Sequence, residues 1–136
     1  MSLDENALVR LVAAWLKGEG FEVKQALTTK QKGIDIVAER HGETWLIEAK
    51  GATSSMVNSP HFGRSFKRGQ VHNRVAKALY TGAKLASGNK IIGAKILLAL
   101  PDHPMFVDFL TPVLPALSLL KIGLLFVNDN GAVRVA

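Results

Sequence analysis

Two carboxylates and one amine in the first half of the chain have the types and spacing that could carry chemistry. Asp35 lies within one apolar segment, and Glu48 and Lys50 lie two residues apart in the next. Carboxylates held side by side among apolar residues repel one another and are costly to desolvate. A hard divalent cation with oxygen ligands removes that cost. The pattern therefore predicts a metal site.

A tight turn between the two segments would bring these side chains together. Residues 41–42 are His and Gly, which favours a two-residue hairpin. In that register Asp35 lies directly opposite Glu48, with Cβ atoms about 5 Å apart. Lys50 shares the same face because side chains alternate along a strand. A longer turn would shift the register by one residue and place Asp35 on the other face.

The expected metal ligands are Asp35, Glu48 and the backbone carbonyl of Ala49, with Mg²⁺ as the ion and Mn²⁺ as its substitute. Lys50 would orient or help deprotonate an attacking water and counter charge on a phosphate. Phosphodiester hydrolysis needs these parts and little else. The alternative interpretation is a solvated cluster of ion pairs on a surface hairpin.

The charge distribution favours a polyanionic partner. The net charge is +6, and no acidic residue occurs between Glu48 and Asp102. That stretch holds a run of cations: Lys50, Arg64, Lys67, Arg68, Arg74, Lys77, Lys84, Lys90 and Lys95. Such a block indicates nucleic acid first and a membrane surface second. A solvated helix face is the alternative.

Most of these cations fall on a helix expected to follow the metal site. We expect five of them to contact nucleic acid: Arg64, Lys67, Arg68, Arg74 and Lys77. Gln70 lies near the start of this helix and on the same stripe as Lys67 and Arg74, at spacings of three and four. From there its side chain could reach the site.

The order of elements needed to position these residues is helix, three strands, helix, strand, helix and hairpin. This order predicts an α/β fold with a mixed sheet flanked by helices on both faces. We expect a single domain over residues 1–136. The expected helices span residues 2–18, 64–87 and 104–120, the last bent or broken near Pro112 and Pro115, and the expected strands span residues 21–27, 33–40, 43–50, 91–100, 123–128 and 132–135.

Cellular setting and assembly follow from composition. The chain has no cysteine, which excludes disulfides and thiolate metal sites and favours a cytoplasmic location. Its N-terminus is acidic and unlike a signal peptide. The apolar stretch 109–120 is too short and too interrupted by proline to span a bilayer, so we expect no membrane association.

Surplus apolar residues over 105–126 make a homodimer an open alternative.

Segments 33–38 (GIDIVA) and 45–51 (WLIEAKG) together resemble the motif of the PD-(D/E)xK, or restriction-endonuclease-like, nuclease superfamily. That motif is an acidic residue on one core strand followed by Glu-x-Lys on the next. The likeness is nearest to Holliday-junction resolvases and to the catalytic domains of type IV restriction enzymes. It covers the αβββαβ order over roughly residues 4–100. Ile34 stands where the motif has proline, a loss that the superfamily tolerates.

The resemblance implies Mg²⁺-dependent phosphodiester hydrolysis, with Asp35 and Glu48 as metal ligands and Lys50 as the catalytic lysine. Some members add an acidic residue from the first helix, and Glu5 is the candidate here. The alternative role of Glu5 is a capping box with Ser2. Some members also place a glutamine on the helix after the site, which Gln70 would match.

Three functions stay open on this evidence. The first is a Mg²⁺-dependent DNA endonuclease directed by DNA structure, such as a junction or damaged DNA. The second is a catalytically inactive module that keeps the nuclease fold and binds nucleic acid. The third is a hydrolase that acts on RNA or nucleotides.

Overall fold

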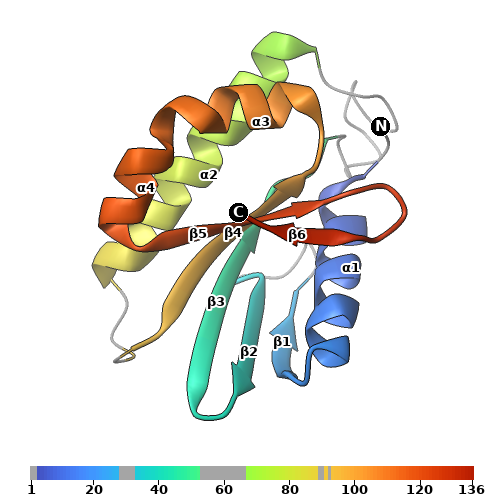
Figure 1. Cartoon of the computed structure of the whole chain (residues 1–136), viewed down its shortest axis with the longest axis vertical. Helices are drawn as coiled ribbons and strands as arrows, with labels where there is room; N and C mark the ends of the chain where they lie inside the picture. Colours follow the sequence, from blue (N-terminus) through green and yellow to red (C-terminus); the bar gives the residue numbers. More distant parts are fainter. Residues whose placement is uncertain (1–2, 28–32, 53–66, 89–90, 92) are drawn as a thin grey trace.

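The strands of the sheet are arranged in the order in which the chain forms them. The computed structural model describes residues 3–27, 33–52, 67–88, 91 and 93–136, and the sheet has the order β1-β2-β3-β4-β5-β6 (Figure 1). Its strands are β1 (Glu22–Ala26), β2 (Ile36–Arg40), β3 (Glu43–Ala49), β4 (Lys95–Pro101), β5 (Ile122–Val127) and β6 (Val133–Val135). The central strands β3, β4 and β5 are parallel, whereas the outer pairs are antiparallel. The expected mixed sheet is confirmed.

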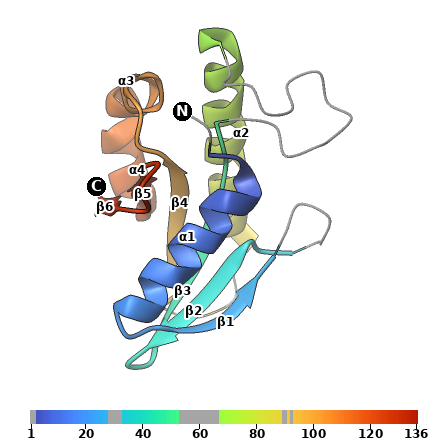
Figure 2. The same ribbon diagram turned by 90° about the vertical axis from the view of Figure 1, so that its right-hand side faces the viewer.

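Helices cover both faces of this sheet, also as expected (Figures 1 and 2). They are α1 (Glu5–Gly18), α2 (Arg68–Gly88), α3 (Pro104–Leu110), the 3-10 turn η1 (Thr111–Val113) and α4 (Leu114–Leu120). The expected start of α2 at Arg64 lies outside the described residues. Among the described residues, no helix combines the length and the apolar character needed to cross a membrane.

Two separate hydrophobic cores result, one on each face of the sheet. Helix α1 presents apolar residues four positions apart, and they pack on the first face with strand residues: Leu8, Val12, Leu16, Ile36, Ile47 and Leu97. Helices α2, α3 and α4 cover the second face. There Val71, Val75 and Phe106 from the helices form a core with Leu46 and Leu98 from the strands. Strands β3 and β4 lie between the two cores, so most of their residues are buried on both faces of the sheet.

Helix α1 begins differently from the capping box expected at Ser2 and Glu5. Asp4 is the N-cap, and its Oδ1 accepts a hydrogen bond from the Ala7 N–H at 2.7 Å. Glu5 is therefore the first helical residue and does not reach back to cap the helix. The capping-box prediction is wrong, because the Asp4 carboxylate takes the role that was assigned to Ser2.

The β2-β3 hairpin has the two-residue turn that the sequence predicts. His41 and Gly42 have φ of 52° and 77°, which matches the turn type that follows the twist of the strands. Strand β2 is shorter than expected, however, because it begins at Ile36 after Gly33 at φ 128°. The alternation of faces breaks there, and Ile34 packs in the second core instead of beside Ile36.

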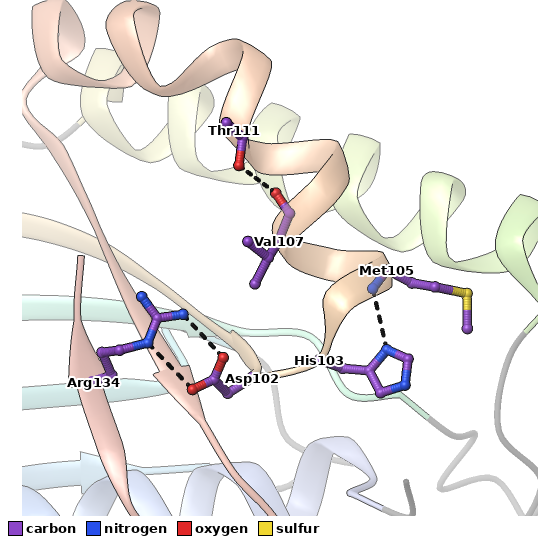
Figure 3. Close-up of polar contacts among 6 residues, drawn as sticks. All are labelled: Asp102, His103, Met105, Val107, Thr111 and Arg134. Atoms are coloured by element: carbon purple, nitrogen blue, oxygen red, sulfur yellow. Dashed lines mark hydrogen bonds and ion pairs between the residues drawn. The ribbon is translucent and has the colours of Figure 1, made fainter.

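The segment 104–120 is divided at its prolines, as expected. Pro112 lies in η1 and Pro115 lies at the start of α4. Proline has no N–H to donate and crowds the preceding turn, so a continuous helix cannot pass through either position. Just before this break, the Thr111 hydroxyl donates to the carbonyl of Val107 at 2.8 Å (Figure 3).

Candidate active site

The hairpin register brings the two predicted metal-binding carboxylates together at the end of β3. Ile36 pairs with Ile47, so the preceding residue, Asp35, lies beside Glu48. Asp35 is not itself part of β2, but its Oδ2 accepts a hydrogen bond from the Ala49 N–H at 2.9 Å. This hydrogen bond extends the contact between the two strands beyond their paired residues, and it fixes the Asp35 side chain.

Glu48 is in an environment that opposes its negative charge. Burial, followed by the charge of Asp35 and a hydrogen bond to its side chain, raises the pKa of Glu48 to about 8. The positive charge of Lys50 lowers the pKa but does not offset the rise. Near neutral pH the carboxyl therefore keeps a proton, and a cation bound at the pair would release it.

Lys50 follows directly after β3, and a neighbouring strand fixes its backbone. Its N–H donates to the carbonyl of Ala99 in β4 at 3.0 Å. Its ammonium Nζ lies 3.6 Å from Oε1 of Glu5, with about a fifth of each side chain exposed (22% and 20%). The lysine is thus held at the edge of the carboxylate pair by contacts to β4 and α1.

Glu5 lies beside two cations, one directly after β3 and one on α2. Its Oε1 is 3.6 Å from Lys50 Nζ and 3.7 Å from Nη1 of Arg74 on α2. Burial raises the pKa of Glu5, while the charge of Lys50 lowers it and the charge of Asp35 raises it. The residue predicted from the first helix therefore joins the site, whereas its catalytic role stays a prediction.

Gly51 allows α1 to approach the end of β3 this closely. A Cβ at this position would lie 2.5 Å from both the carbonyl carbon of Asp4 and the nitrogen of Glu5. Such contacts are too short for any other residue type without a shift of the backbone. One residue further on, the Ala52 N–H donates to the carbonyl of Leu3 at 2.7 Å and holds the two segments together.

The predicted residues on α2 divide between the site and the surface. Arg74 contacts Glu5, as described above. Gln70 Oε1 accepts a hydrogen bond from the Lys67 N–H at 2.8 Å, which is a local contact at the start of the helix. Arg68 Nη1 lies 4.0 Å from Oδ2 of Asp108, and its guanidinium lies over the ring of Phe109. The catalytic role of Gln70 stays a prediction.

The remaining predicted contacts to nucleic acid are on the surface or outside the described residues. Lys67 and Lys77 are exposed, and Arg64 lies outside the part of the chain that the structure describes. Their binding role stays a prediction.

Sequence reasoning missed two features of the site. It placed Arg74 among the DNA contacts without recognising that it adjoins Glu5, and it passed over Gly51. A signal for the first existed, because Arg74 lies one helical turn after Gln70, which was expected to reach the site. The signal for the second was a glycine directly after the Glu-x-Lys string, where a close backbone approach is common.

The donors present suit a hard divalent cation that keeps several waters. Asp35 and Glu48 offer carboxylate oxygens, and the Ala49 carbonyl is the third predicted ligand. Within the described ranges, no group of three or more His, Asp or Glu side chains is arranged to hold a metal ion. A metal here would depend on the two carboxylates, on main-chain oxygen and on water.

Comparison with known proteins shows which family the chain resembles. The model of the Mrr_cat family, described as Restriction endonuclease, matches residues 1–84. A crystal structure of an FdxN element excision controlling factor protein from Anabaena variabilis has a similar fold, with 17% identity and a TM-score of 0.54 over 93% of this chain and 95% of that chain. A search of curated protein sequences gives no match.

The matched region contains the whole candidate site, from Glu5 through the Asp35 and Glu48 pair to Arg74. The superfamily resemblance carried by segments 33–38 and 45–51 is thereby confirmed. Because the family model covers more than half of the sequence, this chain belongs to the restriction endonuclease family.

Proposed function

We propose that this chain is a Mg²⁺-dependent endonuclease that hydrolyses DNA phosphodiester bonds. The observation that carries the proposal is the Asp35 and Glu48 pair, in which burial and the neighbouring acid raise the pKa of Glu48 to about 8 beside Lys50. A strongly perturbed acid pair with an adjacent cation is typical of a functional site. Membership of a restriction endonuclease family supports the same reaction class.

In this proposal Asp35, Glu48 and the Ala49 carbonyl hold the metal ion. A bound Mg²⁺ would supply Lewis acidity and make a bound water easier to deprotonate. The Ala49 N–H fixes one oxygen of Asp35 through the 2.9 Å hydrogen bond, so the carboxylate is oriented before any ligand arrives. Lys50 holds the attacking water or donates to a phosphate oxygen that gains charge in the transition state.

The exposed cations support DNA as the substrate and suggest how it is selected. Lys67, directly before α2, and Arg68 and Lys77 on α2 are exposed. Lysine and arginine at such positions contact phosphates, which position the duplex but carry no sequence information. We therefore propose that the shape of the DNA, as in a junction or at damage, directs cleavage.

The test is a cleavage assay with a panel of substrates in Mg²⁺ and in Mn²⁺. The panel contains linear duplex, a four-way junction, nicked duplex and an RNA of matched sequence. The informative variants are Asp35→Asn and Lys50→Met. Matched controls are Glu39→Gln, a carboxylate on β2 distant from the pair, and Lys17→Met, an exposed lysine of α1. Cleavage that is equal in wild type and in both site variants would refute the proposal.

The alternative is a module that binds nucleic acid without turnover. One observation favours it: the protein of similar structure is named as a factor that controls excision. This alternative predicts salt-sensitive DNA binding with no cleavage of any substrate in either metal. The same panel therefore separates the two functions.

A further inference from the structure

Glu5 presents one carboxylate oxygen to two cations. Lys50 Nζ and Arg74 Nη1 lie 3.6 Å and 3.7 Å from the same atom, Oε1. The three residues come from the end of β3, from α2 and from the start of α1. An oxygen that carries negative charge between an ammonium and a guanidinium is the arrangement that a phosphate oxygen takes in a protein.

The contacts to Glu5 are loose enough to be exchanged. Both distances exceed the usual range of a charge-assisted hydrogen bond, which is about 2.7–2.9 Å. The side chains of Glu5, Lys50 and Arg74 are 20%, 22% and 28% exposed, so solvent and ligand reach all three. Burial also works against the charge of Glu5, since it raises the pKa of this carboxyl. The charges of Lys50 and Arg74 favour the Glu5 carboxylate, and burial opposes it.

Arg74 is better suited to this role than the other cations of α2. Arg68 is 61% exposed and faces Asp108, and Lys77 is exposed on the surface. Arg74 is only 28% exposed and shares the oxygen of Glu5 with Lys50, the lysine of the Glu-x-Lys string. A guanidinium in that position can hold a phosphate through two parallel hydrogen bonds.

We propose that Lys50 and Arg74 form a phosphate clamp and that Glu5 is its internal occupant, which a DNA phosphate displaces on binding. The proposal rests on the proposed function only in taking DNA as the ligand. Glu5 then acts as a competitor that weakens binding of DNA until a phosphate enters. A charged side chain that substrate must displace also disfavours ligands without a phosphate at this point.

The test measures DNA binding without metal, so that cleavage and metal ligation do not contribute. A fluorescent duplex is titrated with protein in EDTA, and Kd is read from anisotropy. Glu5→Gln is expected to tighten binding by about 3-fold to 10-fold, and Arg74→Met to weaken it by a similar factor. In the double variant Glu5→Gln with Arg74→Met, the gain from the glutamine should largely disappear, since the clamp has lost one arm.

Controls separate the clamp from a general change of charge. Glu39→Gln removes one negative charge outside the site, and Lys17→Met removes one positive charge. If Glu39→Gln tightens binding as much as Glu5→Gln, the clamp is overturned. The same holds if the gain from Glu5→Gln persists in full when Arg74 is absent. Thermal unfolding of each variant checks that the fold is retained.

Failure of the clamp and failure of the proposed function give different results. If no DNA is cleaved in Mg²⁺ or Mn²⁺ but Glu5→Gln still tightens metal-free binding through Arg74, the clamp stands without the nuclease. If DNA is cleaved and Glu5→Gln leaves metal-free binding unchanged while it weakens Mg²⁺ binding measured by calorimetry, Glu5 is a metal ligand and the clamp is overturned.

Discussion

Two polar clusters lie at the carboxyl ends of the parallel strands, and they are built in opposite ways. One, around Asp102 after β4, is drawn in Figure 3. Arg134 donates to both oxygens of Asp102, at 2.9 Å and 3.3 Å, and His103 Nδ1 accepts from the Met105 N–H at 3.2 Å as the N-cap of α3. The polar groups in this cluster have complementary partners at hydrogen-bonding distance, so it stabilises the fold.

The cluster at the end of β3 is not balanced in this way. Asp35 and Glu48 are two acids side by side, and the ion pairs of Glu5 are 3.6 Å and 3.7 Å long. Charges that a protein needs only for stability are arranged to neutralise one another, as around Asp102. A bound cation would relieve the repulsion between Asp35 and Glu48, and a bound phosphate could replace Glu5 between its two cations. Unrelieved electrostatic cost of this kind is typical of a site that binds a ligand.

Removal of Lys50 should have the largest effect and separate the two clusters most clearly. We expect Lys50→Met to lower kcat/KM for DNA cleavage by about 100-fold to 10,000-fold, because the cation at the reacting phosphate is lost. Steady-state cleavage in Mg²⁺ measures this. Asp102→Asn in the other cluster should leave kcat/KM within a few-fold of wild type. Equal losses in the two variants would mean that the clusters do not differ in function.

Gly51→Ala should have the next largest effect, because it moves α1 away from the end of β3. Its Cβ would lie 2.5 Å from backbone atoms of Asp4 and Glu5, and overpacking of this kind costs about 1–3 kcal/mol of unfolding free energy. Urea unfolding measures the loss. Gly69→Ala is the control, since nothing lies within 4 Å of its Cβ and it replaces a helical glycine. That variant should be neutral or stabilised by up to about 1 kcal/mol.

The raised pKa of Glu48 should make the metal-free protein less stable as pH rises. The folded state holds the Glu48 proton more tightly than the unfolded chain between the ordinary pKa of 4.5 and about 8. The free energy of unfolding therefore falls with increasing pH across this window, by on the order of 1 kcal/mol after solvent screening. Urea unfolding in EDTA at several pH values measures it.

Glu48→Gln should remove most of that slope and leave the part due to the raised pKa of Glu5, whereas Asp102→Asn should leave it in place. Binding of Mg²⁺ requires the deprotonated carboxyl, so its apparent affinity in wild type should increase up to about pH 8. A wild-type slope that persists in full in Glu48→Gln would assign the titration to another group.

Arg134→Met should have the smallest effect. It removes the pair with Asp102, in which the side chains are 52% and 27% exposed. Because solvent screens such a pair, we expect a loss of at most about 1 kcal/mol in unfolding free energy and unchanged cleavage. Thermal and urea unfolding measure the first, and the cleavage assay the second. A large loss of cleavage would make this cluster part of the active site.

The predictable part of this molecule rests on local rules. The His41-Gly42 turn sets the β2-β3 register, and that register places Asp35 beside Glu48 without knowledge of the rest of the fold. The order of elements along the chain and the break at Pro112 likewise follow from patterns within a few residues. The function of these residues is not settled by their placement, and it stays a proposal.

The parts that sequence reasoning missed depend on contacts between distant segments or on competition between neighbours. Arg74 and Glu5 are far apart in the chain and meet only because α1 and α2 both reach the end of β3. Asp4 and Ser2 are both good N-cap residues, and sequence alone does not decide between them. Strict alternation would place Ile34 on the same face as Ile36, whereas Ile34 precedes the paired part of β2 and packs in the second core.

The order of the sheet, in which each strand lies beside the next one in the chain, has a consequence for synthesis. Strands can add one at a time to the growing edge as the nascent chain emerges. The carboxylate pair is present once β3 has folded back on β2. Lys50, however, is fixed through the carbonyl of Ala99. The arrangement therefore stays incomplete on the ribosome until β4 has emerged and paired.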